Sequence, residues 1–262
     1  MRYKANALCC FRFVTLFWYC STVRLKLRTV DHIYKATAPT TLNSGTSTYG
    51  PRRVIGSQDI DGKGTKHDFE SCDPFLYFDD SLLPRGRMPP LGRHPHSGLL
   101  SLTVPLEGDH VRPWDNIAEP RPPLQCGGLY AVHAANGIVH SESEALPNPA
   151  AKGPHNHLCQ VWLDPGTHVF GKQSIPVVHI VAPHDVPEVA EEGLRARVLL
   201  GSYEGLESPV ETYYARVLLL DCSMEPDAPE AVLHLPDHYT SAFVYLPRGG
   251  GAGGFGAGRV AV

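Results

Sequence analysis

Short apolar runs separated by glycine and proline most strongly constrain how this chain can fold. With 25 Gly, 24 Pro and only 19% charged residues among 262, the chain has many turn formers and little material for long helices. Runs of this length between turn residues are typical of a β-sandwich or β-barrel, so we expect an all-β protein. One short helical candidate covers Val186–Gly193. The expected strands are Leu99–Leu106, Leu129–Ala134, Leu158–Leu163, Val177–Val181, Arg197–Leu200, Tyr213–Leu220, Val232–Leu235 and Ala242–Leu246.

Two pairs of polar residues stand two positions apart within this pattern. His94 and His96 flank a proline just before an apolar run, and His140 and Glu142 follow an Asn-Gly turn signal. In an extended strand, residues two apart point to the same face of the sheet. A rolled antiparallel sheet can therefore bring three imidazoles and one carboxylate together inside a barrel.

This combination of side chains predicts a metal site. Three neutral nitrogens and one charged oxygen suit Fe(II), Mn(II), Ni(II) or Cu(II), and octahedral geometry leaves two positions open for water, substrate or dioxygen. Zn(II) is a further alternative, although a closed tetrahedral zinc site serves to hold a fold together rather than to react.

The 14 histidines of the chain include other candidates. We expect His155 and His157 to lie in a loop, and His133 to be packed or hydrogen-bonded rather than a ligand. His234 and His238 could begin a second site, but little chain follows them to supply its other half.

Cysteine usage and net charge exclude several classes of protein. The seven cysteines are scattered and form no C-x-x-C pair, which favours free thiols in a reducing compartment over disulfides or a thiolate zinc site. A formal net charge of −4 gives no indication of direct nucleic-acid binding.

The first 48 residues differ from the rest. Arginine and lysine precede the first acid, Asp31, and the apolar stretch Ala7–Cys20 is short and interrupted by Arg12, so we expect no membrane span. Three interpretations stay open: an organelle transit peptide, a secretory signal, or a poorly ordered extension or mis-called start.

Several segments resemble the pirin family of bicupins. The segments "HPHSGLLSLTVPLEG" and "GGLYAVHAANGIVHSE" are similar to the two metal-binding motifs of that family, and "LCQVWLDP" is similar to its next conserved strand. Upstream, "RRVIGS" and "DPFLYFDD" fit the usual approach to the first motif. The similarity spans roughly residues 52–246 and is specific in the two metal motifs.

The resemblance implies a domain organisation and a ligand set. It implies an N-terminal extension at 1–48, a metal-binding cupin domain at 49–183, and a partial second cupin at 184–262 that ends in a glycine-rich tail. The Fe(II) ligands carried over from the family are His94, His96, His140 and Glu142.

The chain also departs from the family pattern. Ser97 replaces an arginine, and other departures fall at Leu99–Leu100, Ala131–Val132 and His133–Ala135, which line or support the cavity in relatives. The segment Ala231–Leu246 resembles only the opening strands of the second cupin. We therefore expect an incomplete C-terminal barrel that is less stable or depends on a partner.

The family resemblance implies two functions. One is oxygenolytic cleavage of a flavonol such as quercetin, with O₂ as co-substrate and Glu142 as the catalytic base. The alternative is a non-enzymatic, iron-dependent coregulator of transcription factors, and a third interpretation is a degenerate metal-binding cupin without turnover. Cytoplasmic or nuclear location follows from the resemblance, and organelle targeting from the N-terminal extension.

Overall fold

The computed structural model describes four stretches of the chain, residues 74–165, 175–191, 194–212 and 217–224, with the backbone alone at 191 and 224. It also describes the strand segments 14–19, 33–35, 50–55, 244–248 and 259–261, in which only the side chains of Ile55 and Tyr245 are described, and the single positions 233 and 239.

Two sheets form a barrel in the N-terminal half. The larger has the order β11-β8-β6-β10-β4-β3 and the smaller β5-β9-β7, with antiparallel pairing throughout. The strands of the larger sheet are β3 (Gly50–Ile55), β4 (Phe75–Pro84), β6 (Leu100–Glu107), β8 (Leu129–His133), β10 (His155–Leu163) and β11 (Val177–Val181). Those of the smaller sheet are β5 (His94–His96), β7 (His110–Asp115) and β9 (Ile138–Leu146).

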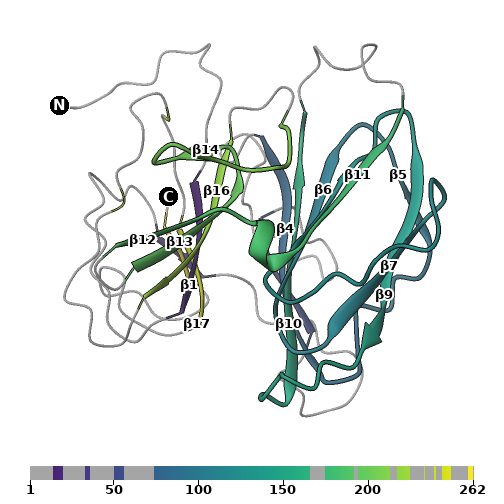
Figure 1. Cartoon of the computed structure of the whole chain (residues 1–262), viewed down its shortest axis with the longest axis horizontal. Coiled ribbons are helices and arrows are strands. Elements are labelled where there is room, and N and C mark those ends of the chain that lie inside the picture. Colours follow the sequence, from purple (N-terminus) through teal and green to yellow (C-terminus); the bar gives the residue numbers. More distant parts are fainter. Residues whose placement is uncertain are drawn as a thin grey trace.

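A third sheet packs on the outer face of the larger barrel sheet, so the molecule has three layers (Figure 1). Its order is β12-β13-β16-β1-β17-β18-β2, and β1 pairs in parallel with both β16 and β17. Its strands are β12 (Glu188–Glu191), β13 (Leu194–Leu200), β16 (Leu218–Met224), β1 (Val14–Tyr19), β17 (Val244–Arg248), β18 (Arg259–Ala261) and β2 (Ile33–Lys35). A small ribbon of β14 (Ser202–Tyr203) and β15 (Leu206–Glu207) follows β13, and the 3-10 helix Pro183–Asp185 precedes β12.

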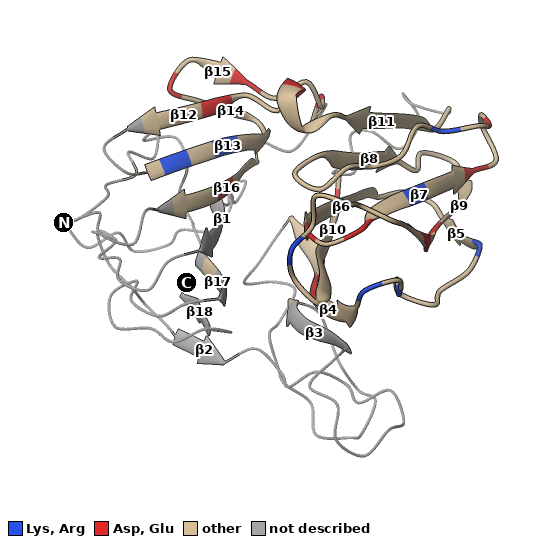
Figure 2. Ribbon diagram, turned by 60° about the horizontal axis from the view of Figure 1, so that its bottom comes forward, with Lys and Arg blue, Asp and Glu red and all other residues tan. Residues whose placement is uncertain are grey.

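Alternation along the strands gives the larger barrel sheet two different faces. On β6, Leu100, Leu102 and Val104 point to the outer face and belong to the core shared with the third sheet. Ser101 and Thr103, on the same strand, point into the barrel and are buried there. β8 and β11 carry no Asp, Glu, Lys or Arg, and Figure 2 shows both without charge. The outer face thus joins the two halves, while the inner face is free to carry polar groups.

The all-β prediction is confirmed, and two local predictions are wrong. The expected strand Val177–Val181 matches β11 at both ends. The helical candidate at Val186–Gly193 is a strand instead, because four of its residues pair with β13 and a helix of two turns is too short to be stable alone. His155 and His157 lie in β10 rather than a loop, since this central strand pairs with both β4 and β6.

Other expectations fall outside the described residues. These include the strand at 232–235, the pair His234 and His238, the glycine-rich tail and most of the first 48 residues, although the backbone at 14–19 forms β1. The described C-terminal residues form one sheet and a ribbon. The domain boundaries at 48 and 183 stay predictions. The described residues contain no helix with the length and hydrophobicity that a membrane crossing needs.

At one end of the barrel, the buried carboxylate of Asp109 forms hydrogen bonds with the segments that follow β4 and β9. Asp109, between β6 and β7, accepts from Arg85 Nε at 2.9 Å and from its Nη2 at 2.5 Å. The backbone N–H of Gly86 donates to Asp109 Oδ2 at 2.7 Å, and that of Asn148 donates to Oδ1 at 3.3 Å. Asn156 accepts from the Asp109 backbone N–H at 2.7 Å. The Arg85 hydrogen bonds lower the pKa of Asp109 to about 2.

This carboxylate makes stability depend on pH in the acid range. Because the pKa of Asp109 is lower in the folded than in the unfolded chain, its stabilisation is complete above about pH 4 and is lost as the pH falls towards 2. We expect Asp109→Asn to have a lower free energy of unfolding than the parent at pH 7. The difference between the two free energies should become smaller below pH 4. Urea unfolding from pH 2 to 7 measures this, with the exposed Asp185→Asn as matched control; a gap that is constant with pH would contradict the assignment.

Candidate metal centre and adjoining cavity

The register of β9 with β5 brings the three predicted histidines together. His94 lies opposite His140, and His96 lies opposite Ile138, two residues further along β5. The ring centroids are 4.6 Å apart for His94 and His140, 4.8 Å for His96 and His140, and 4.9 Å for His94 and His96. One nitrogen of each ring lies within 4.8 Å of the others, so the three rings could hold a metal ion together.

Glu142 lies beside this cluster on the same face of β9. Its Oε1 is 3.6 Å from His140 Nδ1 and accepts a hydrogen bond of 2.8 Å from Thr103 Oγ1 on β6. The structure therefore brings the three predicted histidines within ligand distance of one another, and it places Glu142 beside His140 but outside that group.

The ring nitrogens fit a metal ion better than they fit the surrounding protein. The Nε2 atoms of His94 and His96, and both ring nitrogens of His140, are buried and have no hydrogen-bond partner among the described residues. His94 Nδ1 lies 3.0 Å from the carbonyl oxygen of Gly92. Donation of the Nδ1 proton to that carbonyl leaves Nε2 as a lone-pair donor, which is the arrangement that orients a histidine ligand.

The protonation states of the cluster also suit a cation. Burial, reinforced by the neighbouring imidazoles, lowers the pKa of His96 and of His140 to about 4, so both rings are neutral at pH 7. Burial raises the pKa of Glu142, because a carboxylate in this region has lost its hydration. A divalent cation would offset the negative charge of the Glu142 carboxylate and would be bound by the lone pairs of the neutral rings. The residues therefore fit the Fe(II) that the family resemblance implies.

Aromatic rings hold two of the histidines in place. Trp162 on β10 meets His96 edge to face at a centroid distance of 4.9 Å and stacks on Tyr77 at 4.3 Å. Tyr130 on β8 lies parallel to His140 at 5.9 Å. These contacts restrict the ring orientations that a metal site requires.

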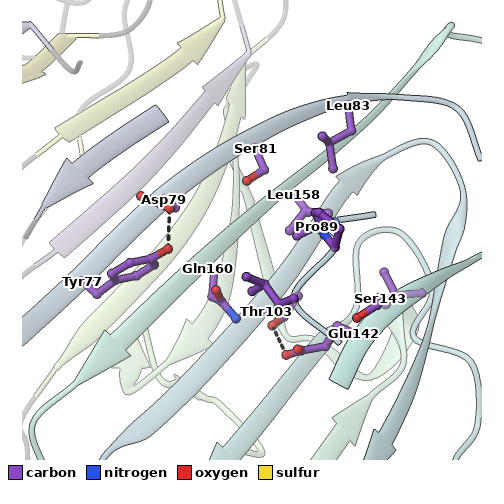
Figure 3. Close-up of a pocket in the computed structure, with 13 residues that line it drawn as sticks. Tyr77, Asp79, Ser81, Leu83, Pro89, Thr103, Glu142, Ser143, Leu158 and Gln160 are labelled. Carbon is purple, nitrogen blue, oxygen red and sulfur yellow. Dashed lines mark hydrogen bonds between the residues drawn. The ribbon is translucent and has the colours of Figure 1, made fainter. Parts of the chain in front are cut away.

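A cavity of about 210 Å³ is lined by Glu142 but by none of the three histidines (Figure 3). Its polar lining residues come from four strands, and its apolar wall includes Leu83, Pro89, Val111 and Leu158. His96 and Ser97 line a separate and more open surface hollow of about 370 Å³. The polar lining of the cavity consists of Tyr77, Asp79, Ser81, Thr103, Glu142, Ser143 and Gln160.

Sequence reasoning found the four clustered residues but missed the rest of the cavity. Alternation within "FLYFDDSLL" and "HLCQVWL" was the available signal, because it places Tyr77 and Asp79, and likewise Gln160 and Trp162, on one face. The positions Leu99–Leu100 and Ala131–Val132, which line or support the cavity in relatives, do not line it here; Leu100 and Ala131 belong to the core with the third sheet.

Two other histidines take structural roles. His133, as predicted, is buried and hydrogen-bonded, with Nε2 2.8 Å from the carbonyl oxygen of Glu211. His157 lies on the outer face, where its Nε2 is 2.5 Å from Asp80 Oδ1, and Tyr245 donates to the other carboxylate oxygen. Asp80, His157 and Cys159 also lie within ligand distance of one another, but the first two are already hydrogen-bonded to each other.

The fold and the site define a class of protein: a cupin-type barrel with three clustered histidines on its inner face that could hold a metal ion. Comparison with known proteins shows which family this chain is similar to. A pirin-like protein of Arabidopsis thaliana is 29% identical over 191 residues, which cover 71% of this chain and 56% of that protein. Three pirin proteins of that plant match 70% to 76% of this chain at 27% to 29% identity, so the chain is similar to the pirin family. It spans only 52% to 66% of the length of four pirin relatives, and no protein-family model matches it.

Solved structures agree on the fold. The crystal structure of GK1651 from Geobacillus kaustophilus superimposes with a TM-score of 0.66 at 24% identity, over 92% of this chain and 86% of that one. A quercetin 2,3-dioxygenase from Acinetobacter baumannii superimposes with a TM-score of 0.53 at 21% identity, over 70% of this chain and 60% of that one. At these identities the likeness concerns the fold.

The hydrogen bond from Thr103 to Glu142 predicts the effect of a single substitution. Thr103→Val keeps the shape but removes the donor, and loss of a group that orients a ligand typically weakens metal affinity 10–100-fold. We expect that loss in a competition titration of Fe(II) against a chelator. Thr103→Ser, which keeps the hydroxyl, should stay close to the parent; equal losses in both variants would indicate that packing, not the hydrogen bond, matters.

Proposed function

We propose that the protein binds Fe(II) through His94, His96, His140 and Glu142 and acts as an oxygenase on a small enol or phenol. The observation that carries the proposal is the group of buried, unpartnered imidazole nitrogens beside a buried carboxylate, next to a cavity. A bound Fe(II) ion would supply the redox chemistry that dioxygen requires.

The protein groups around the cavity divide the remaining tasks. The cavity reaches the centre at Glu142, whose carboxylate lines it, so a substrate hydroxyl placed there lies within reach of a proton acceptor. Thr103 orients that carboxylate through its hydrogen bond. The apolar wall formed by Leu83, Val111 and Leu158 excludes water from the reacting end of the substrate.

The similarity to a quercetin 2,3-dioxygenase structure and the pirin resemblance make flavonols the first substrates to test. The Mn, Ni, Cu and Zn ions are alternative occupants of the same ligand set. A metal-loaded protein without turnover would correspond to the alternative role, a coregulator that presents an iron-dependent surface to a protein partner, or to a degenerate cupin.

Metal content and oxygen uptake test the proposal together. The full chain, reconstituted anaerobically with Fe(II), should hold about one iron per chain and consume O₂ when compounds from a single-ring catechol up to quercetin are supplied. His140→Ala and Glu142→Gln should each lower bound iron at least tenfold, because each removes one of four ligands.

The matched control is His184→Ala, which removes an exposed imidazole outside the site. It should bind iron like the parent. Parent-like iron content in His140→Ala and Glu142→Gln would show that the ligand assignment is wrong, whereas iron binding without substrate-dependent O₂ uptake would favour the non-enzymatic alternatives.

A further inference from the structure

Three uncharged polar side chains, Ser101, Tyr130 and Trp162, lie on the inner face of the larger barrel sheet. They come from β6, β8 and β10, which are adjacent in the order β8-β6-β10. Trp162 is the register partner of Ser101, and Tyr130 is the register partner of Thr103, two residues further along β6. Because directly opposite residues share a face of the sheet, all three side chains point into the barrel, as Thr103 does.

The polar atoms of these three side chains are buried and have no partner. The Ser101 hydroxyl, the Tyr130 hydroxyl and the Trp162 indole N–H form no hydrogen bond with any of the described residues. A buried donor without an acceptor costs free energy, and folded proteins leave few of them. Three such groups on one face therefore indicate a bound partner that the described part of the chain does not supply.

The three side chains adjoin the histidine cluster. Trp162 meets His96 at a centroid distance of 4.9 Å, and Tyr130 lies parallel to His140 at 5.9 Å. The buried ring nitrogens of the cluster do not accept from these donors, since they are unpartnered themselves. None of the three side chains lines the cavity at Glu142, so they define a separate place beside the centre.

The charge of an occupied centre favours an anion at this place. A divalent ion held by three neutral imidazoles, beside the single carboxylate of Glu142, leaves one positive charge in a buried region. A monoanion would neutralise it. The indole N–H can only donate a hydrogen bond, and both hydroxyl groups can donate one, so the three groups suit a ligand that accepts. Hydrogen bonds to an anion are also stronger than those to a neutral acceptor.

We propose that Ser101, Tyr130 and Trp162 form a pocket for a small monoanion that binds to the metal ion as a further ligand. This inference rests on the proposed function for the presence of the metal ion, and it holds with or without turnover. The anion is small because the three donor atoms are buried inside the barrel. The cavity at Glu142 is then left to the organic substrate.

Azide titration of the full-length protein loaded with Co(II) tests the pocket. Co(II) takes the same types of ligand as Fe(II), and its visible absorption changes when an anion binds to it. We expect Ser101→Ala, Tyr130→Phe and Trp162→Phe each to weaken azide binding about tenfold, because each removes one hydrogen bond to a charged group. Co(II) affinity should stay close to that of the parent, since every variant keeps an aromatic ring against His96 and His140.

The matched control is Ser202→Ala, which removes an exposed hydroxyl in the β14–β15 ribbon. It should bind azide like the parent. Equal azide affinity in the parent and in the three pocket variants overturns the inference. Circular dichroism verifies that each variant is folded, and Ser101→Ala and Tyr130→Phe, which each remove a single oxygen atom, decide the outcome if Trp162→Phe fails to fold.

The stability of the metal-free protein gives a second measurement that needs no ligand. An unpartnered buried hydroxyl contributes a cost to the fold, so metal-free Ser101→Ala should have a free energy of unfolding at least equal to that of the metal-free parent. Urea unfolding measures this. A clear loss of stability would show that the hydroxyl serves the fold, and it would overturn the assignment of Ser101.

The outcomes separate this inference from the proposed function. Parent-like azide binding in the three variants, together with iron-dependent O₂ uptake, overturns the pocket and leaves the oxygenase proposal intact. Azide binding that depends on the three donors, without substrate-dependent O₂ uptake, supports the pocket and removes the oxygenase proposal. A full chain that takes up neither Fe(II) nor Co(II) overturns both.

Discussion

The pairing of β9 with both β5 and β7 is the constraint on which the site depends. It places His140 and Glu142 on the inner face of the barrel, and its register with β5 sets His94 opposite His140. Because side chains alternate strictly along a strand, a slip of one residue would turn these groups to the other face. The barrel thereby brings together several buried ring nitrogens that have no hydrogen-bond partner among the described residues. Burial of such atoms is unfavourable, and a bound cation is the simplest way to offset that free-energy cost.

The larger barrel sheet serves two structures at once. Its outer face is an apolar core shared with the third sheet, which includes Phe78, Leu102 and Leu219. Its inner face carries polar side chains that line the cavity and the aromatic rings that contact His96 and His140. Since the outer core stabilises the sheet, the inner face can bury polar groups such as Asp79 and Thr103, which would be unfavourable in a barrel closed only by its own packing.

The four clustered residues could be predicted because their signal is local. A spacing of two within a strand places both members of each pair on one face, and the turn before Ile138 marks where the second strand begins. Thr103 and Asp79 could not be found in this way, since each looks like an ordinary polar residue of a strand, and only pairing with β10 brings them to one cavity. The segment at Glu188–Glu191 was misjudged because its hydrogen-bond partners lie across a hairpin, in β13.

The sequence by itself determined that this protein is built from short strands and that three imidazoles and a carboxylate face one way from two of them, because alternation along a strand needs no information from the rest of the chain. Only the tertiary structure decided which strands became neighbours, and with them the cavity of about 210 Å³ and the residues that line it. Strand order and register are set by the free energy of packing two faces against different partners, and that free energy is a property of the assembled sheets, not of any one segment.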